Sequence, residues 1–132
     1  MRYFYADIRE IRVNKQKIEQ PYQPYDWFDQ LPEEKRRKPI GNKEALFLSS
    51  CLGDGHDVFL ALDLEKSAIE IAVRDFRNKA SKLKPSVQLL CKWTERNGSN
   101  ATYDLLINGL KEFEDYHPGL IEWGKIQNRV MK

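Results

Sequence analysis

The chain has 132 residues, which is enough for one ordinary domain and a short additional segment. Its 22 Lys and Arg residues against 20 Asp and Glu residues leave a net charge of +2, and this near balance argues against a protein that binds nucleic acid through bulk positive charge. Because no apolar run approaches the roughly 18 residues of a spanning helix, and the N-terminus has no apolar signal core, we expect no direct membrane insertion.

The first segment, residues 3–18, has an ambiguous pattern. Phe4, Ile8, Ile11 and Ile18 keep helical spacing, whereas Ile11 and Val13 alternate as they would in a strand. We favour a helix for this segment.

Residues 1–41 are expected to form an N-terminal extension that is largely irregular between residues 20 and 41. Four of the six prolines lie before Gly41, and proline disfavours helix at its own position and at the preceding residue. The charged run at residues 33–38 is interpreted as a solvated linker rather than a nuclear signal.

This N-terminal arm is rich in aromatic residues, unlike a disordered linker. Two interpretations remain equally open, since aromatic rings favour both buried and interface positions. The rings pack on the rest of the protein, or they bind a partner. The aromatic residues expected to make these contacts are Tyr22, Tyr25, Trp27 and Phe28.

Residues 42–132 contain successive helical patterns and no credible pair of strands. The first helix is expected to have Asn42 as its N-cap, because the asparagine side chain accepts bonds from free N–H groups, and to end at Gly53. A short second helix follows the turn at residues 53–55. Its expected buried residues are Val58, Phe59 and Leu62.

The third helix is expected to begin near Glu65 or Ser67 and to present a wide apolar face. The residues of this face are Ala68, Ile69, Ala72, Val73 and Phe76. The next segment, residues 77–84, carries four cations and no acid, so we expect an exposed basic loop. Pro85 suits the first turn of the fourth helix, where its missing N–H costs nothing.

The fourth helix is expected to bury Leu90 and Trp93 and to end at Asn97 and Gly98. The fifth helix is then capped by Ser99 or Asn100, and its inward residues are expected to be Ala101, Leu105, Leu106, Leu110 and Phe113. A final helix opens at residues 116–118, with partly inward positions at Leu120, Ile121, Trp123, Ile126 and Val130. The predicted fold class is all-α, an antiparallel six-helix bundle.

The stretch from Leu90 to Thr102, LCKWTERNGSNAT, with the leucines that follow it, resembles the fourth and fifth helices of death domains. Trp93 matches the core tryptophan near the end of helix four in that family, and Ala101-Thr102 matches the pair that opens helix five. Upstream, the runs at 52–54, 61–64 and 69–70 resemble the first three helices. The resemblance covers roughly residues 42–128 and implies the death-fold Greek key.

The sequence departs from this family at one position. Death domains usually carry a tryptophan at the start of the second helix, where this chain has Gly55-His56-Asp57. The core role of that tryptophan would then fall to His56, or to Trp27 or Trp123 from outside the pattern.

No catalytic residue, metal ligand set or cofactor site is expected. Cys51 near His56 and Asp57 is interpreted as a small buried thiol, because nothing nearby would activate it as a nucleophile. The two cysteines and two histidines lack the close spacing of zinc ligands. The absence of a cysteine framework also favours a reducing, cytoplasmic location.

The expected surface is electrically divided, with acids concentrated before residue 71 and cations after residue 73. Opposite patches of this kind allow copies to pair heterologously, head to tail. The predicted partner-binding residues are Asp54, Asp57, Glu70, Arg74, Arg77, Lys82, Lys84, Lys92 and Arg96.

The resemblance implies a non-enzymatic, homotypic interaction domain that assembles a cytoplasmic signalling complex of the apoptosis or innate-immune type. Its expected partners are other death-domain proteins, namely a receptor, an adaptor, a kinase or a protease-recruiting adaptor, together with copies of itself. We expect no nucleic acid as partner. One alternative nevertheless stays open, a helical nucleic-acid-binding module that uses the basic loop 77–84. Another is the regulatory part of a larger enzyme.

Overall fold

The computed structural model describes residues 23–53 and 55–132, and these residues are helical without a named strand. The α-helices are α1 (Glu33–Arg36), α2 (Asn42–Ser49), α3 (Val58–Ala61), α4 (Lys66–Arg77), α5 (Pro85–Asn97), α6 (Tyr103–Tyr116) and α7 (Trp123–Met131). Short 3-10 helices lie at Phe28–Gln30 and Gly98–Asn100. The helix expected at residues 3–18 lies outside the described residues.

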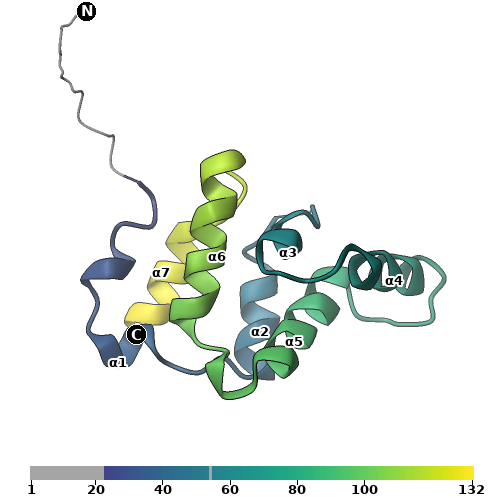
Figure 1. The fold of residues 1–132 in the computed structure, drawn as a ribbon, viewed down its shortest axis with the longest axis horizontal. Helices are drawn as coiled ribbons and strands as arrows, with labels where there is room; N and C mark the ends of the chain where they lie inside the picture. The colour runs from purple at the N-terminus through teal and green to yellow at the C-terminus, as the bar shows by residue number, and fades with distance from the viewer. Residues whose placement is uncertain (1–22, 54) are drawn as a thin grey trace, which may run out of the picture.

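The predicted all-α class is confirmed, and α2 to α7 follow one another in the predicted order. Helix α2 packs against α5, α5 against α4, and α3 against α6. Helix α4 and the loop after it occupy the end of the molecule opposite α1 and the C-terminus (Figure 1). Helix α1 was not predicted. It forms within the charged run at residues 33–38, which was expected to be a linker, and it packs against α6.

Both predicted ends of the first helix, α2, were wrong. Gly41, not Asn42, is the N-cap of α2, and it contributes no side-chain hydrogen bond. The helix also ends at Ser49 instead of Gly53. Gly53 instead turns the chain four residues later with a φ of +79°, a conformation that favours glycine.

The limits of the last two helices also differ from the prediction. Thr102 is the N-cap of α6, and its Oγ1 accepts a hydrogen bond from the Leu105 N–H at 3.3 Å. Ser99 and Asn100, the predicted caps, belong to the 3-10 helix that precedes it. Because α6 continues to Tyr116, the final helix begins only at Trp123.

One hydrophobic core joins the helices, and Leu90, Trp93 and Leu106 are almost completely buried in it. Three predicted inward residues are wrong, since Phe76, Leu105 and Leu120 are 41%, 40% and 52% exposed. In α6 the apolar stripe follows Tyr103, Leu106, Ile107, Leu110 and Phe113. A helix buries only one such stripe, and Leu105 lies on the other side of it.

Part of the N-terminal arm belongs to the same core. Trp27 and Phe28 are buried, and their rings meet edge to face with centroids 5.7 Å apart. Trp123 is also buried, whereas His56 is only half-buried. The two tryptophans outside the family pattern therefore fill core positions, and the histidine does not.

Candidate interaction surfaces

A basic surface lies where α4 ends and the chain turns back into α5. We call Arg77, Lys79, Lys82 and Lys84 the basic edge. All four side chains are exposed, and none forms an ion pair with another described residue. Within the described residues, no acid offsets the repulsion among these cations, and their exposed charges can attract an anionic partner.

The basic edge also borders apolar surface. A shallow groove of about 490 Å³ is lined by Val73, Phe76 and Pro85, with His56, Arg77 and Lys84 beside them. Phe76 is 41% exposed, and Leu83 in the loop is 53% exposed. This surface therefore combines positive charge with accessible hydrophobic side chains.

The other predicted charges on α4 share one face, because Glu70, Arg74 and Arg77 are spaced by four and three residues. Arg74 Nη2 lies 3.7 Å from Asp75 Oδ1, with both side chains more than a third exposed. Exposed pairs of this kind contribute only about 0–1 kcal/mol, so Arg74 can exchange this partner easily.

Two predicted residues on α5 lie apart from the basic edge. Lys92 borders a small groove between α4 and α5 that also contains Ile71 and Cys91. Arg96, one turn later, instead donates a hydrogen bond from Nη1 to the carbonyl oxygen of Asp63. That contact holds a residue with a φ of +65°, an uncommon conformation for an aspartate.

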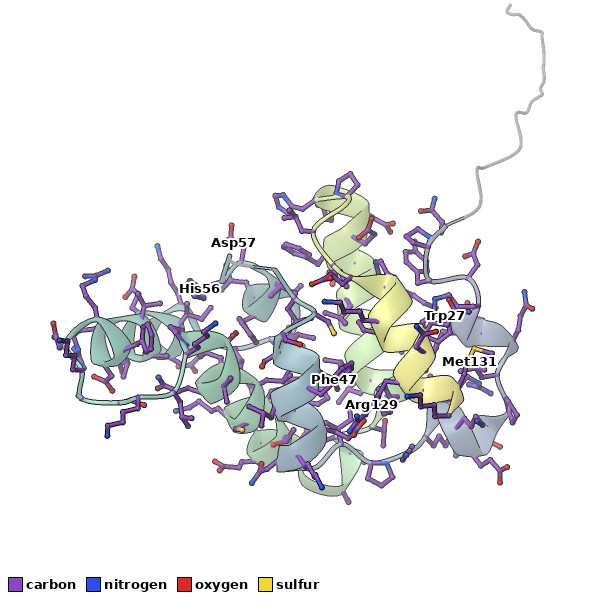
Figure 2. All side chains as sticks on the ribbon, turned by 180° about the vertical axis from the view of Figure 1, so that it is seen from behind. Trp27, Phe47, His56, Asp57, Arg129 and Met131 are labelled. Atoms are coloured by element: carbon purple, nitrogen blue, oxygen red, sulfur yellow. The ribbon has the colours of Figure 1, made fainter. Side chains whose placement is uncertain are left out.

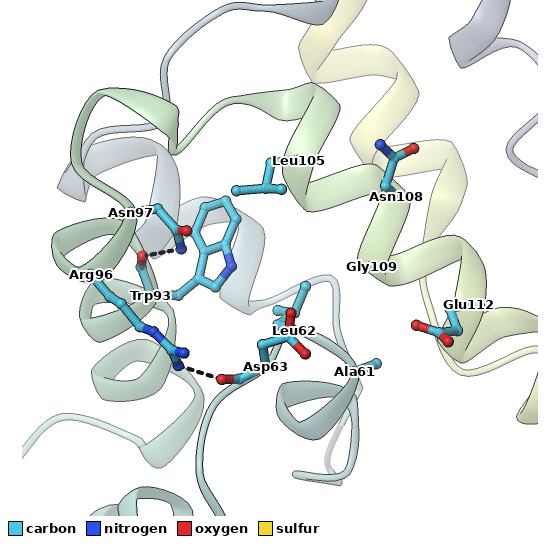
Figure 3. Close-up of a pocket in the computed structure, with 10 residues that line it drawn as sticks. All are labelled: Ala61, Leu62, Asp63, Trp93, Arg96, Asn97, Leu105, Asn108, Gly109 and Glu112. Carbon is cyan, nitrogen blue, oxygen red and sulfur yellow. Dashed lines mark hydrogen bonds between the residues drawn. The ribbon is translucent and has the colours of Figure 1, made fainter.

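Arg96 and Asp63 stand at the mouth of a groove of about 290 Å³ between α3, α5 and α6 (Figure 3). Trp93 and Leu105 also line this groove. The groove is narrow because α3 and α6 approach closely at Gly109. A Cβ atom at this glycine would lie 2.6 Å from Leu62 Cδ2.

A fourth groove, of about 520 Å³, lies between α3 and α6 and carries acidic groups. We call Asp57, Asp63 and Glu112, which line it, the acidic groove. Leu60 and Tyr116 also line it and are 47% and 77% exposed. Asp54, predicted to belong to the same acidic surface, lies outside the described residues.

Sequence reasoning missed the contributions of Leu60, Glu112 and Tyr116 to this groove. They come from helices that are distant in sequence, so no local pattern joins them. The available signal was Gly109 within an otherwise helical apolar pattern, since an internal glycine often marks a close approach of two backbones.

Asp57 and His56 lie together at the start of α3, well separated from Trp27 and Met131 (Figure 2).

The predicted arm contacts divide between the core and the surface. Tyr22 lies outside the described residues, and Trp27 and Phe28 are buried. The ring of Tyr25 lies 5.4 Å from that of Trp123, and its hydroxyl donates to Asp115 Oδ1 at 2.8 Å. Burial and the Asp115 carboxylate raise the pKa of Tyr25 to about 12.

Asp29 of the arm also bonds to α6, since Lys111 Nζ lies 2.8 Å from Asp29 Oδ1. Together with the Tyr25 and Asp115 pair, this contact attaches the arm to α6 at two points. The described part of the arm is therefore occupied in contacts within the molecule.

The thiols and carboxylates show no reactive arrangement in the described residues. Burial raises the pKa of both Cys51 and Cys91, which disfavours the thiolate. No group of three or more His, Cys, Asp or Glu side chains in residues 23–53 and 55–132 could hold a metal ion. None of the described helices has the length and hydrophobicity needed to cross a membrane.

Comparison with known proteins gives one family match. The family model of the Death domain matches residues 60–117, which run from the second half of α3 through α4 and α5 to the end of α6. No curated protein and no solved structure matches the chain significantly. The matched residues include Trp93 in α5 and the Ala101-Thr102 pair that precedes α6, and every named element of the described residues is a helix. The match therefore supports a death domain over residues 60–117.

Proposed function

We propose that this death domain assembles a cytoplasmic signalling complex of the apoptosis or innate-immune type and has no enzymatic activity of its own. Death domains are homotypic protein–protein interaction modules of signalling. The proposed partners are death domains of receptors, adaptors and kinase- or protease-recruiting proteins, together with copies of this chain.

The observation that carries this proposal is the presence of two surfaces of opposite charge on different elements. The acidic groove is built by α3 and α6, whereas Arg74 and Arg77 belong to the last turns of α4. Contact between the acidic groove of one copy and the cations of another uses different patches on the two copies. Such heterologous contact leaves one free patch at each end and can continue into an open assembly.

Hydrophobic side chains add to the charge complementarity. Leu60 and Tyr116 are exposed beside the acids, and Phe76 is exposed beside the cations. Single exposed ion pairs contribute only about 0–1 kcal/mol, so specific binding requires apolar contact at the centre of the interface as well. We expect the binding to weaken at high salt because the charges are exposed.

The test uses two full-length variants with reversed charge. One variant, Arg74→Glu with Arg77→Glu, reverses the α4 cations, and the other, Asp57→Lys with Glu112→Lys, reverses the acidic groove. Each variant alone is expected to lose self-association in light scattering and binding to other death domains in pull-down. A mixture of the two is expected to associate, because the reversed surfaces are again complementary.

The exposed Lys43 in α2 provides the matched control, since Lys43→Glu also changes one cation to an acid. This control is expected to bind like the unaltered protein. Circular dichroism shows whether each variant keeps its helices. Unchanged binding by both charge-reversed variants would overturn the assignment of these surfaces.

A further inference from the structure

The basic edge combines a run of cations with accessible hydrophobic side chains in one short segment of the chain. Four cations and no acid occur in residues 77–84. Leu83 lies between Lys82 and Lys84 in the sequence and is 53% exposed, and Phe76 directly precedes Arg77 and is 41% exposed. We propose that the basic edge docks the domain on the surface of a membrane that contains anionic lipid.

The position of the loop suits contact with an extended surface. The loop between α4 and α5 forms one end of the molecule and projects away from α6 and α7 (Figure 1). The nearest acid in the sequence, Asp75, is already paired with Arg74. A negatively charged surface can therefore approach this end without meeting an unpaired carboxylate of residues 74–84.

The hydrophobic side chains distinguish a lipid surface from duplex DNA. Both offer phosphate groups to the four cations. Only the lipid surface also offers an apolar layer beneath its headgroups, into which Leu83 and Phe76 can be buried. Peripheral docking of this kind needs no spanning helix.

The groove beside the loop distinguishes a lipid surface from an acidic peptide. A peptide in that groove would contact Phe76, Arg77 and Lys84, which line it. Lys79, Lys82 and Leu83 do not line the groove and would remain outside such a contact. A membrane contacts a broad area, and the distribution of the cations along the loop fits it better.

The expected effects follow from the charge and the apolar area. Each cation near an anionic membrane surface raises the partition coefficient about fivefold, so removal of two lowers it about 25-fold. Loss of one leucine that is buried on binding lowers it roughly tenfold. The first effect fades at high salt, whereas the second persists.

The test is co-sedimentation of the full chain with vesicles of phosphatidylcholine, with and without phosphatidylserine. The unaltered protein is expected to sediment only with the phosphatidylserine vesicles. Lys82→Ala with Lys84→Ala should lower that binding about 25-fold. Leu83→Asn should lower it roughly tenfold.

Matched controls come from other surfaces of the chain. Leu46 in α2 is 56% exposed, so Leu46→Asn removes a comparably exposed leucine. Lys43→Ala with Lys66→Ala removes two exposed lysines outside the loop. Both control variants are expected to bind vesicles like the unaltered protein.

Three outcomes would overturn the proposal: equal binding to both kinds of vesicle, no loss in the Lys82 and Lys84 variant, or no loss in Leu83→Asn. If the protein binds duplex DNA tightly but does not bind vesicles, and Leu83→Asn leaves the DNA binding unchanged, the loop is a nucleic-acid-binding site instead. Because self-association is measured without vesicles, failure of this proposal leaves the result for the homotypic interface unaffected.

Discussion

Glu44 and Arg129 are 85 residues apart in the chain and form a two-point contact between α2 and α7. Arg129 donates from Nε at 3.0 Å and from Nη2 at 2.5 Å, both to Glu44 Oε1. The Tyr103 hydroxyl of α6 donates to the other carboxylate oxygen. The guanidinium also lies 4.8 Å from the ring centroid of Phe47, and Figure 2 shows these two side chains together. One carboxylate therefore connects three helices.

Replacing Glu44 by glutamine is expected to lower the free energy of unfolding by about 1–3 kcal/mol. The change removes the charge that Arg129 and Tyr103 contact, and hydrogen bonds to charged groups at partly buried sites contribute in this range. Urea unfolding followed by tryptophan fluorescence measures the loss. Glu122→Gln is the control, since the Glu122–Lys125 pair is largely exposed, and we expect a loss below about 1 kcal/mol there. Equal losses would contradict the special role of Glu44.

The same contact predicts a dependence of stability on pH. The hydrogen bond from Arg129 lowers the pKa of Glu44 below its ordinary value of 4.5, against the opposing effect of burial. A carboxylate with a lowered pKa stabilises the fold fully above its unfolded pKa, and the stabilisation is lost as the pH falls through the folded pKa.

The difference in unfolding free energy between the unaltered protein and Glu44→Gln should therefore be constant from neutral pH down to about pH 5. It should shrink progressively at lower pH. Urea titrations at a series of pH values provide the measurement. A difference that stays constant into strongly acidic solution would show that the Glu44 charge is not its source.

Gly109→Ala and Gly124→Ala are expected to change stability in opposite directions. A Cβ atom at Gly109 would lie 2.6 Å from Leu62 Cδ2 and 3.2 Å from the Ala61 carbonyl oxygen, so both the Leu62 side chain and the α3 backbone would have to shift. Overpacking by the added methyl group costs about 1–3 kcal/mol of stability. Replacing glycine by alanine inside a helix gains about 1 kcal/mol in helix propensity, so the cost exceeds the gain at Gly109. At Gly124 nothing lies within 4 Å, so only the gain remains.

Thermal unfolding is the measurement for both glycine variants. Gly109→Ala should lower the melting temperature, and Gly124→Ala should raise it slightly. An increase for both would mean that α3 and α6 separate without cost, and the groove between them would then be adaptable.

Phe28→Ala is expected to destabilise the whole bundle by about 3–5 kcal/mol, because deletion of a buried phenylalanine leaves a cavity. Phe28 is 1% exposed although it precedes the helices by sequence. The matched control is Phe76→Ala, whose side chain is 41% exposed; it should change stability by about 0.5 kcal/mol or less. A small effect at Phe28 would show that the arm is dispensable for folding.

The all-helical class and the order of α2 to α7 could be predicted from the amino-acid sequence. The sequence also indicated the family, through Trp93 and the Ala101-Thr102 pair. These features depend on helical spacing and on residues within a turn or two of one another, so they can be read locally. Pro85 at the start of α5 is such a case, because its lack of an N–H group costs nothing there.

The exact caps could not be chosen from the sequence. Ser99, Asn100 and Thr102 all suit an N-cap, and Thr102 takes the position because a 3-10 helix uses the other two. Competition between several adequate caps is decided by how the following helix packs. The exposure of Leu105 likewise depends on which stripe of α6 faces the core.

The composition of the acidic surface, unlike that of the basic edge, depends on how distant helices pack. The four cations of residues 77–84 lie at the end of α4 and in the loop after it, close together in the chain, so the sequence alone places them together. The acidic groove instead joins Asp57 to Glu112 because α3 and α6 approach closely at Gly109. Such a crossing depends on packing between helices distant in the chain, and local spacing carries no information about it.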